Sequence, residues 1–255
     1  MPNPLIEICV EGIDGLAAAQ AAGADRVELC ASLLEGGLTP SSGVIKQALA
    51  IAMIPFHVII RPRGGDFLYS ELEFITMLDD VRACRDMGVA GVVFGCLTSD
   101  GRIDEARMRE LTEVARPMRV TCHRAFDMTR DPEEAIEALV RCGVDRVLTS
   151  GQRDTAIEGI DILRRTHDAA RGRIVIMACG ALDERNIADV LRRSHADELH
   201  FAALTTVASG MAFRNPNVGM GGTAIEREFE VTLTDKDAVR RTISAARALK
   251  PVVAG

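Results

Sequence analysis

Eight short apolar runs, each followed by an amphipathic stretch, restrict the possible folds of this chain more than any other feature. Four of the runs share one pattern, in which a turn leads into a β-rich segment: residues 23–30 (GADRVELC), 88–96 (GVAGVVFGC), 143–151 (GVDRVLTSG) and 195–204 (HADELHFAAL). The other four lie between them: residues 5–11 (LIEICVE), 56–62 (FHVIIRP), 119–126 (RVTCHRAF) and 173–180 (RIVIMACG). Strict alternation of strand and helix predicts a parallel sheet.

Eight strand-and-helix units close most economically into a (β/α)8 TIM barrel with the helices outside. An additional C-terminal helix is predicted at residues 235–249, DKDAVRRTISAARAL. A doubly wound open sheet is the alternative fold, but its first strand is usually followed by a glycine-rich phosphate fingerprint, which EGIDG at residues 11–15 does not match. With no linker or shift in composition, residues 1–255 are expected to form a single TIM-barrel domain.

Local signals mark where helices begin. Ser70 with Glu73, and Asp131 with Glu134, both fit a capping box, in which two residues satisfy each other's backbone N–H groups. Pro132 suits the first position of the second of these helices.

The segment 205–233 breaks the alternation, because it shows no sustained period. An irregular run of this length inside a compact domain is usually functional or takes part in assembly. We expect either a lid or a dimer contact. Thr234 and Asp237 are expected to cap the helix that follows.

Charge and composition exclude several classes of partner. The net charge of −7 and the absence of basic runs argue against nucleic acid. No basic leader precedes an apolar stretch at the N-terminus, and no run approaches the roughly 20 apolar residues that span a bilayer, so no membrane contact is expected. Seven cysteines, an odd number without dense spacing, indicate a reducing compartment, and we expect a cytoplasmic protein.

The interior of the predicted barrel is polar. Side chains alternate across a strand, so the apolar residues that face the helices leave their neighbours pointing inward. These inward residues are Glu7 and Cys9, Glu28 and Cys30, His57 and Arg61, Thr121 and His123, and His200. Buried charges cost several kcal/mol unless they are paired or ligated. The set is therefore either a ligand site or, for Glu7, Glu28 and His57, a structural network at the barrel floor.

An anionic ligand has candidate contacts at the strand ends. Arg61 and Arg63 end the third strand beside Gly64 and Gly65, where a guanidinium fork suits a carboxylate or phosphate and backbone can approach closely. Pairing of Arg63 with Asp66 in the same loop explains that residue equally well.

Later strand ends offer further candidates. His123 is a possible acid or base, oriented by Arg124 or Asp127. Ser150 with Gly151, and Gly180, lie in the region where many barrels bind a phosphate. Ordinary strand-to-helix turns account for them as well.

Two cysteines differ from the rest. Cys9 and Cys30 fall on adjacent strands, which lie roughly 4.8 Å apart in a sheet. Both side chains are expected to point inward near the catalytic rim. The shear of the barrel decides whether the two thiols are level or diagonal. Such a pair suits a soft monovalent ion such as Cu(I). The alternative is two buried thiols without a role, which is the interpretation we give to Cys84, Cys122 and Cys142.

Five segments together resemble the CutC copper homeostasis proteins: residues 5–45, RPRGGDFLYS, VTCHRAFDM, LTSG and FRNPNVGMGG. The resemblance implies an eight-stranded barrel, a cytoplasmic location, a homo-oligomer that is often a dimer, and copper handling through Cu(I). Cys9 and Cys30 match the proposed copper-ligand positions of that family.

Two functions of different class follow. As a binding protein, the chain holds Cu(I) between Cys9 and Cys30 and buffers or delivers it. As an enzyme, it binds a small anionic metabolite and moves protons, alone or around a harder divalent metal. Its catalytic residues would come from one set: Glu7, Glu28, His57, Arg61, His123 and His200.

Overall fold

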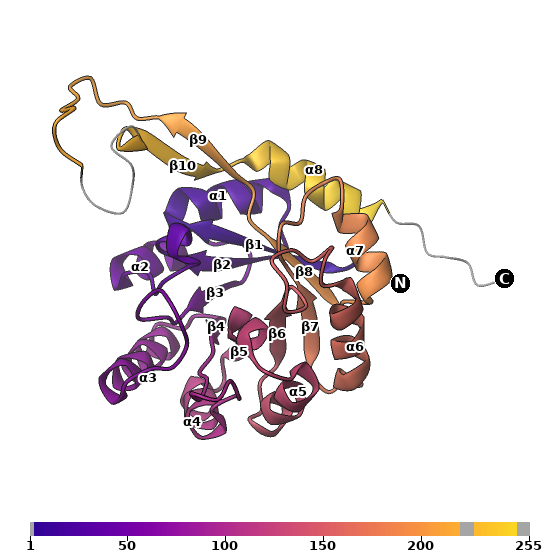
Figure 1. Cartoon of the computed structure of the whole chain (residues 1–255). Coiled ribbons are helices and arrows are strands. Elements are labelled where there is room, and N and C mark those ends of the chain that lie inside the picture. Colours follow the sequence, from indigo (N-terminus) through magenta and orange to yellow (C-terminus); the bar gives the residue numbers. More distant parts are fainter. Residues whose placement is uncertain (1–2, 220–226, 249–255) are drawn as a thin grey trace.

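A computed structural model describes residues 3–219 and 227–248 of the chain. Eight parallel strands form a closed barrel in sequence order, and the eighth pairs with the first (Figure 1). The strands are β1 (Leu5–Glu11), β2 (Arg26–Cys30), β3 (Phe56–Ile59), β4 (Gly91–Phe94), β5 (Arg119–Cys122), β6 (Arg146–Thr149), β7 (Val175–Ala178) and β8 (Glu198–Phe201). All eight lie within the predicted runs, and the TIM barrel is confirmed.

Helices surround this barrel (Figure 1). They are α1 (Gly12–Ala22), α2 (Ser42–Ile51), α3 (Glu71–Asp86), α4 (Glu105–Ala115), α5 (Pro132–Arg141), α6 (Ile160–Ala170), α7 (Ile187–Ser194) and α8 (Lys236–Arg247), with short 3-10 turns η1 (Leu33–Glu35) and η2 (Arg124–Met128). The predicted C-terminal helix is α8, which packs against both α1 and α7 and so closes the ring. No helix in the described ranges is long and apolar enough to cross a membrane.

The apolar core lies between the strands and the helices. Ile6, Ile8 and Val10 of β1 are fully buried there, as the alternation predicts. Inside the barrel, two glycines of the β4 segment make room for large neighbours. A Cβ at Gly91 would lie 2.4 Å from the His57 ring, and one at Gly95 would lie 2.9 Å from the His123 ring. The polar interior therefore depends on these two glycines.

The helix-start signals are partly confirmed. Ser70 and Glu73 form the complete capping box. Asp131 accepts hydrogen bonds from the backbone at the start of α5, but the carboxylate of Glu134 pairs with Arg130 instead of completing a box. The expected cap of α8 was wrong, because the side chain of Asp235 accepts the first backbone N–H groups.

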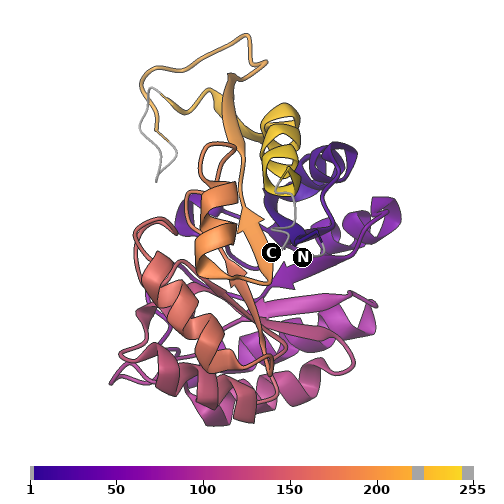
Figure 2. The same ribbon diagram turned by 90° about the vertical axis from the view of Figure 1, so that its right-hand side faces the viewer.

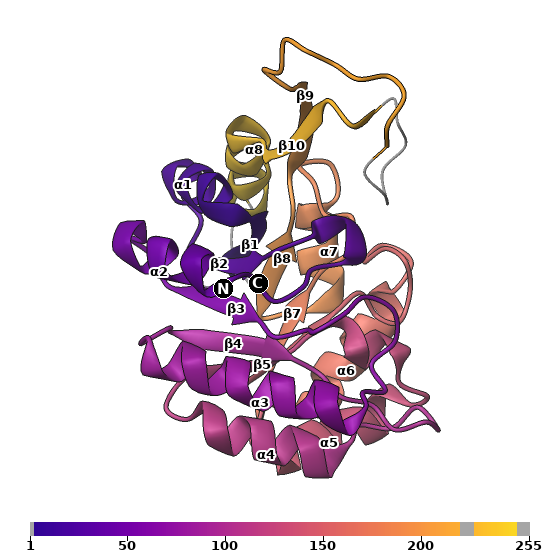
Figure 3. The ribbon, with the colours of Figure 1, turned by 90° about the vertical axis from the view of Figure 1, so that its left-hand side faces the viewer.

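The segment between β8 and α8 contains an antiparallel hairpin that the sequence did not predict. Strands β9 (Leu204–Ala208) and β10 (Glu230–Thr234) pair along their whole length. Both side views show the hairpin projecting away from the barrel, beyond α8 (Figures 2 and 3). Residues 220–226, which belong to the same predicted segment, lie outside the described residues.

Candidate functional site

A cavity of about 410 Å³ opens at the carboxyl ends of the strands. Its walls come from the segments that follow β2, β3, β5, β7 and β8, as expected for the functional face of this fold. Six predicted site residues line it: Cys9, Glu28, Arg61, His123, Gly180 and His200. The structure thus brings together half of the predicted set.

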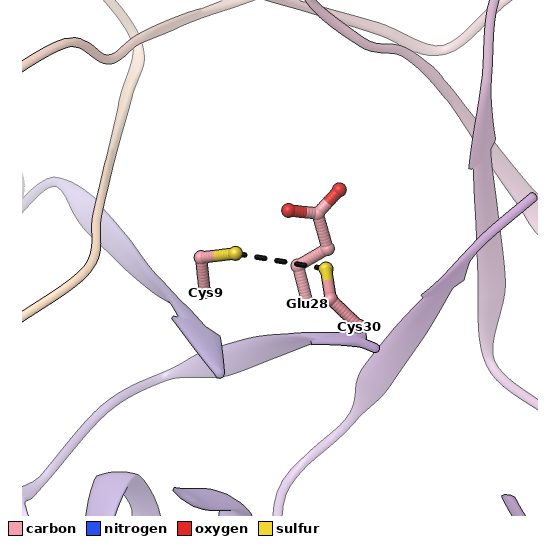
Figure 4. A group of neighbouring side chains, drawn as sticks. All are labelled: Cys9, Glu28 and Cys30. Carbon is pink, nitrogen blue, oxygen red and sulfur yellow. Dashed lines mark hydrogen bonds between the residues drawn. The ribbon is translucent and has the colours of Figure 1, made fainter. Parts of the chain in front are cut away.

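The two predicted cysteines meet beside this cavity, which Cys9 lines. The strand register places Cys9 beside Glu28 and Glu11 beside Cys30, so the cysteines are diagonal on neighbouring strands. Their Sγ atoms are nevertheless 3.6 Å apart, and both side chains are buried. Figure 4 shows the side chains of Cys9, Glu28 and Cys30 projecting to the same side of the sheet. One ligand atom from each of these residues lies within 4.8 Å of the others, which is compact enough to hold a metal ion.

Below the thiols, a charged network fills the centre of the barrel. Glu7 accepts hydrogen bonds from Arg26 and, at 2.8 Å, from Nδ1 of His200. Arg26 also donates to Glu198 at 2.5 Å, and Arg146 donates to the same carboxylate through two nitrogens, at 2.6 and 2.9 Å. All five side chains are buried. Glu7 is therefore held by a structural network.

Three members of this network were missed in the sequence. Arg26 precedes Glu28 by two residues, and Glu198 precedes His200 by two, so the same alternation that identified Glu28 and His200 also places these residues inside. Arg146 has the equivalent position at the start of β6. The signal was present, but each residue stands at the first position of its strand, where a boundary is hard to place.

His57 lies close to the charges of this network and does not line the cavity. Burial, together with the charges of Arg26 and Arg146, lowers the pKa of His57 to about 4, although Glu7 acts in the opposite direction. The imidazole is therefore neutral at pH 7. Its Nδ1 atom is buried without a hydrogen-bond partner.

The thiols differ in ionisation. The hydrogen bond with Cys30 lowers the pKa of Cys9 to about 5; burial opposes this, and His200 and Glu28 add to it. The same contact, with burial and the charge of Cys9, raises the pKa of Cys30 well above 9. At neutral pH, Cys9 is a thiolate and Cys30 is a thiol.

The neighbouring groups match this distribution of charge. Burial and the Cys9 thiolate raise the pKa of Glu28 well above its usual range, so this carboxyl group holds a proton more tightly than an exposed glutamate does. Burial opposes protonation of His200, but hydrogen bonding to Cys9 and Glu7 raises its pKa well above 6.5. These shifts favour the protonated form of His200 beside the Cys9 thiolate, and they favour the protonated form of Glu28.

Arg61 is largely occupied by its own loops. Its guanidinium donates to the backbone carbonyls of Glu35, Gly37 and Gly65, at 2.6, 3.1 and 2.8 Å. It also lies 5.2 Å from the centre of the Phe67 ring. Only Nε is without a partner. Arg61 therefore shapes the cavity rim and has one donor left for a ligand.

His123 faces the cavity as a neutral imidazole. Burial and the charge of Arg61 lower the pKa of His123 to about 3. Nδ1 accepts the backbone N–H of Ala125 at 3.2 Å, so the ring proton is on Nε2, which is buried without a partner. The expected orientation of His123 by Arg124 or Asp127 is not seen, because Arg124 and Asp127 bond to each other and to Ser150.

The other predicted binding residues lie outside the cavity lining. Arg63 is held at the surface by Glu73 and Asp66, at 2.6 and 3.1 Å. Ser150 is fully buried behind the wall, and Gly151 packs against the backbone of Gly159.

Comparison with known proteins places this chain in a family. The model of the CutC family matches residues 4–205. A "family protein CutC" of Mesorhizobium japonicum is 66% identical over 245 residues, covering 96% of this chain and 95% of the relative. The "Copper homeostasis protein cutC homolog" of Homo sapiens is 44% identical over 243 residues, covering 95% of this chain and 89% of the relative.

A solved structure supports the same assignment. The putative copper homeostasis protein CutC from Streptococcus agalactiae superimposes with a TM-score of 0.74 and 33% sequence identity, covering 78% of this chain and 98% of that chain. The chain described here belongs to the CutC family.

Proposed function

We propose that this protein binds one Cu(I) ion between Cys9 and Cys30 and buffers or delivers it in copper homeostasis. The observation that carries the proposal is the contact of the two Sγ atoms, 3.6 Å apart, beside the cavity. Thiolates are the ligands that Cu(I) prefers over oxygen. The human and Streptococcus agalactiae relatives, whose names refer to copper homeostasis, support the same function.

The charge of the site favours a monovalent ion. With Cys9 ionised and Cys30 protonated, the thiol pair carries one negative charge. Cu(I) bound to two thiolates also leaves one negative charge, so the metal replaces the Cys30 proton and the buried charge is unchanged. A divalent ion such as Zn²⁺ would add a positive charge to an interior in which the carboxylates of Glu7 and Glu198 are already paired with arginines.

Titration of the reduced protein with Cu(I), in competition with a chromogenic Cu(I) chelator, tests the proposal. We expect one Cu(I) per chain and release of about one proton per ion at pH 7.5, since only Cys30 must ionise. X-ray absorption should show a first shell of sulfur. Substoichiometric binding, or a shell of nitrogen and oxygen alone, would refute the site.

We further infer that the protein forms a homodimer through the β9–β10 hairpin. This projecting segment exposes large apolar side chains, including Phe213 at 74% and Met211 at 57% of their surface. Apolar surface gathered on one protruding element is typical of an interaction site. Because the hairpin projects beyond α8 in Figures 2 and 3, a second copy of the chain could pack against it.

Sedimentation of the full chain tests the dimer. Phe213→Asp is expected to shift the protein to the monomer, because a buried carboxylate at an interface costs several kcal/mol. Leu72→Asp on α3 is the matched control, since Leu72 is 78% exposed and lies on another element. A monomeric wild-type protein, or equal effects of the two changes, would contradict the inference.

The cysteine inventory supports a cytoplasmic location, which we also propose. All seven cysteines are free, and Cys9 and Cys30 are close enough that an oxidising compartment would threaten the proposed metal site. Cell fractionation checks this: recovery of the protein in a secreted fraction would exclude it.

A further inference from the structure

The turn after β7 lines the cavity and has backbone donors that no group of the protein uses. Gly180, Ala181 and Leu182 all line the cavity wall. Within the described ranges, their three successive N–H groups donate to no group of the protein. Gly180 has φ 104° and Ala181 has φ 53°, a conformation that a non-glycine residue adopts only when its surroundings impose it. Successive N–H groups in such a turn form a concave site for anions.

The segment after β6 holds this turn in place. The carbonyl of Gly180 accepts the N–H of Ala156 at 2.9 Å. A Cβ on Gly180 would lie 2.9 Å from the Cβ of Ser150 and 3.1 Å from the nitrogen of Ala156. Both the positive φ and the lack of space therefore require glycine at this position.

Arg124 adds a positive charge beside the turn. Its Nη2 donates to the Ser150 hydroxyl at 2.7 Å, and Ser150 is the residue that contacts Gly180 on its other side. Nε of Arg124 donates to Asp127 at 2.8 Å, while Nη1 donates to no group in the described part of the chain. Arg124 and the 180–182 turn both line the cavity.

Two further donors, on residues that line the cavity, are buried and unpaired. They are Nε2 of His123 and Nε of Arg61, whose residues are 4% and 6% exposed. Leaving a buried donor unpaired costs about 1–3 kcal/mol. The rest of the lining is largely apolar and includes Leu33, Ile59 and Phe67. An apolar pocket of this size with a few unpaired polar atoms is typical of a small-molecule site.

We propose that Arg124 and the 180–182 turn form an oxyanion subsite, and that the cavity binds a small molecule bearing a phosphate or carboxylate. Its remaining acceptor atoms would receive hydrogen bonds from His123 and Arg61. A guanidinium and successive backbone N–H groups are the donors that proteins use for such anions. This function is additional to Cu(I) binding and does not depend on it, since the subsite contains neither Cys9 nor Cys30.

Calorimetric titration with inorganic phosphate and, separately, with acetate tests the subsite and distinguishes the two anions. We expect saturable binding of at least one of them at one site per chain. Arg124→Gln should weaken it at least about tenfold, equivalent to 1.4 kcal/mol. This variant should fold, because Asp127 keeps its hydrogen bonds to Thr149 and to the backbone of Ser150 and Gln152.

Two further variants test the same subsite. Gly180→Ala should abolish binding, whereas Arg192→Gln, which removes an equal charge from an exposed position on α7, should leave it unchanged. Calorimetry with an anion reports on this subsite, and Cu(I) competition reports on the thiol pair, so failure of the copper site and failure of this subsite are separable. Absence of binding for both anions, or equal losses in Arg124→Gln and Arg192→Gln, would overturn the proposal.

The donors across the cavity need a larger probe. Glycerol phosphate carries both an oxyanion and hydroxyl acceptors, and it should bind more tightly than inorganic phosphate. His123→Asn keeps an oxygen that can accept the Ala125 N–H but lacks Nε2–H. This variant should bind glycerol phosphate more weakly than the wild type does, and its affinity for inorganic phosphate should be unchanged. Equal affinity of wild type and His123→Asn for glycerol phosphate would overturn this part of the proposal.

Discussion

Replacing Cys9 and Cys30 together by serine is expected to lower the affinity for Cu(I) at least about a thousandfold, equivalent to about 4 kcal/mol. A serine hydroxyl is a hard oxygen donor that stays protonated at neutral pH, whereas Cu(I) selects soft thiolates. The loss should be nearly complete because, among the described residues, no other pair of cysteine sulfurs is in contact.

Competition with a Cu(I) chelator measures the effect, and the single variants add detail. Cys9→Ser should be more damaging than Cys30→Ser, because Cys9 supplies the thiolate that is already ionised. Cys142→Ser is the matched control: Cys142 is also buried, and a serine hydroxyl can replace its Sγ contact with the carbonyl of Glu105. Unchanged affinity in the double variant would end the copper interpretation of this site.

The sequence predicted the barrel well because its main signals are local. A strand needs only a short β-rich run, and the glycine that ends a helix marks where the next run begins. Alternation then placed Glu7, Cys9, Glu28 and Cys30 inside, where the structure has them. The hairpin was missed because β9 and β10 are separated by a long connection and exposed along almost their whole length, so neither shows a buried face.

The partners of the interior residues could not be predicted in the same way. Whether Glu7 contacts His57, Arg26 or His200 depends on the stagger between strands, which no single strand reveals. The sequence also showed a guanidinium at Arg61 but not the three carbonyls that occupy it, since these come from loops whose path is set by the whole fold.

The charged network and the thiol site are connected through one residue. His200 bonds to Glu7 on one side and lies beside Cys9 on the other. Arg26 helps to keep Glu7 ionised, and ionised Glu7 helps to keep His200 protonated. The protonated imidazole in turn favours the Cys9 thiolate. The lower network therefore sets the charge of the proposed metal site as well as stabilising the barrel.

Glu198→Gln should accordingly lower the free energy of unfolding by about 3–5 kcal/mol, as expected when one partner of a buried ion pair is removed. Glu198 is 8% exposed and is the shared partner of Arg26 and Arg146, so the change leaves two buried guanidinium groups without this counter-charge. Urea unfolding at pH 7 measures the loss.

Glu137→Gln is the matched control for this change, because the pair of Glu137 with Arg173 lies at the surface and should contribute less than about 1 kcal/mol. The pH dependence gives a second check. Burial raises the pKa of Glu198, but hydrogen bonds from Arg146 and Arg26 lower it below 4.5 overall. The contribution of Glu198 to the free energy of unfolding is therefore present above pH 4.5 and is lost as the pH falls through the folded-state pKa. The difference in the free energy of unfolding between wild type and Glu198→Gln should become smaller over the same pH range. Equal stabilities of the Glu198 and Glu137 variants at pH 7 would mean that the barrel centre does not depend on this ion pair.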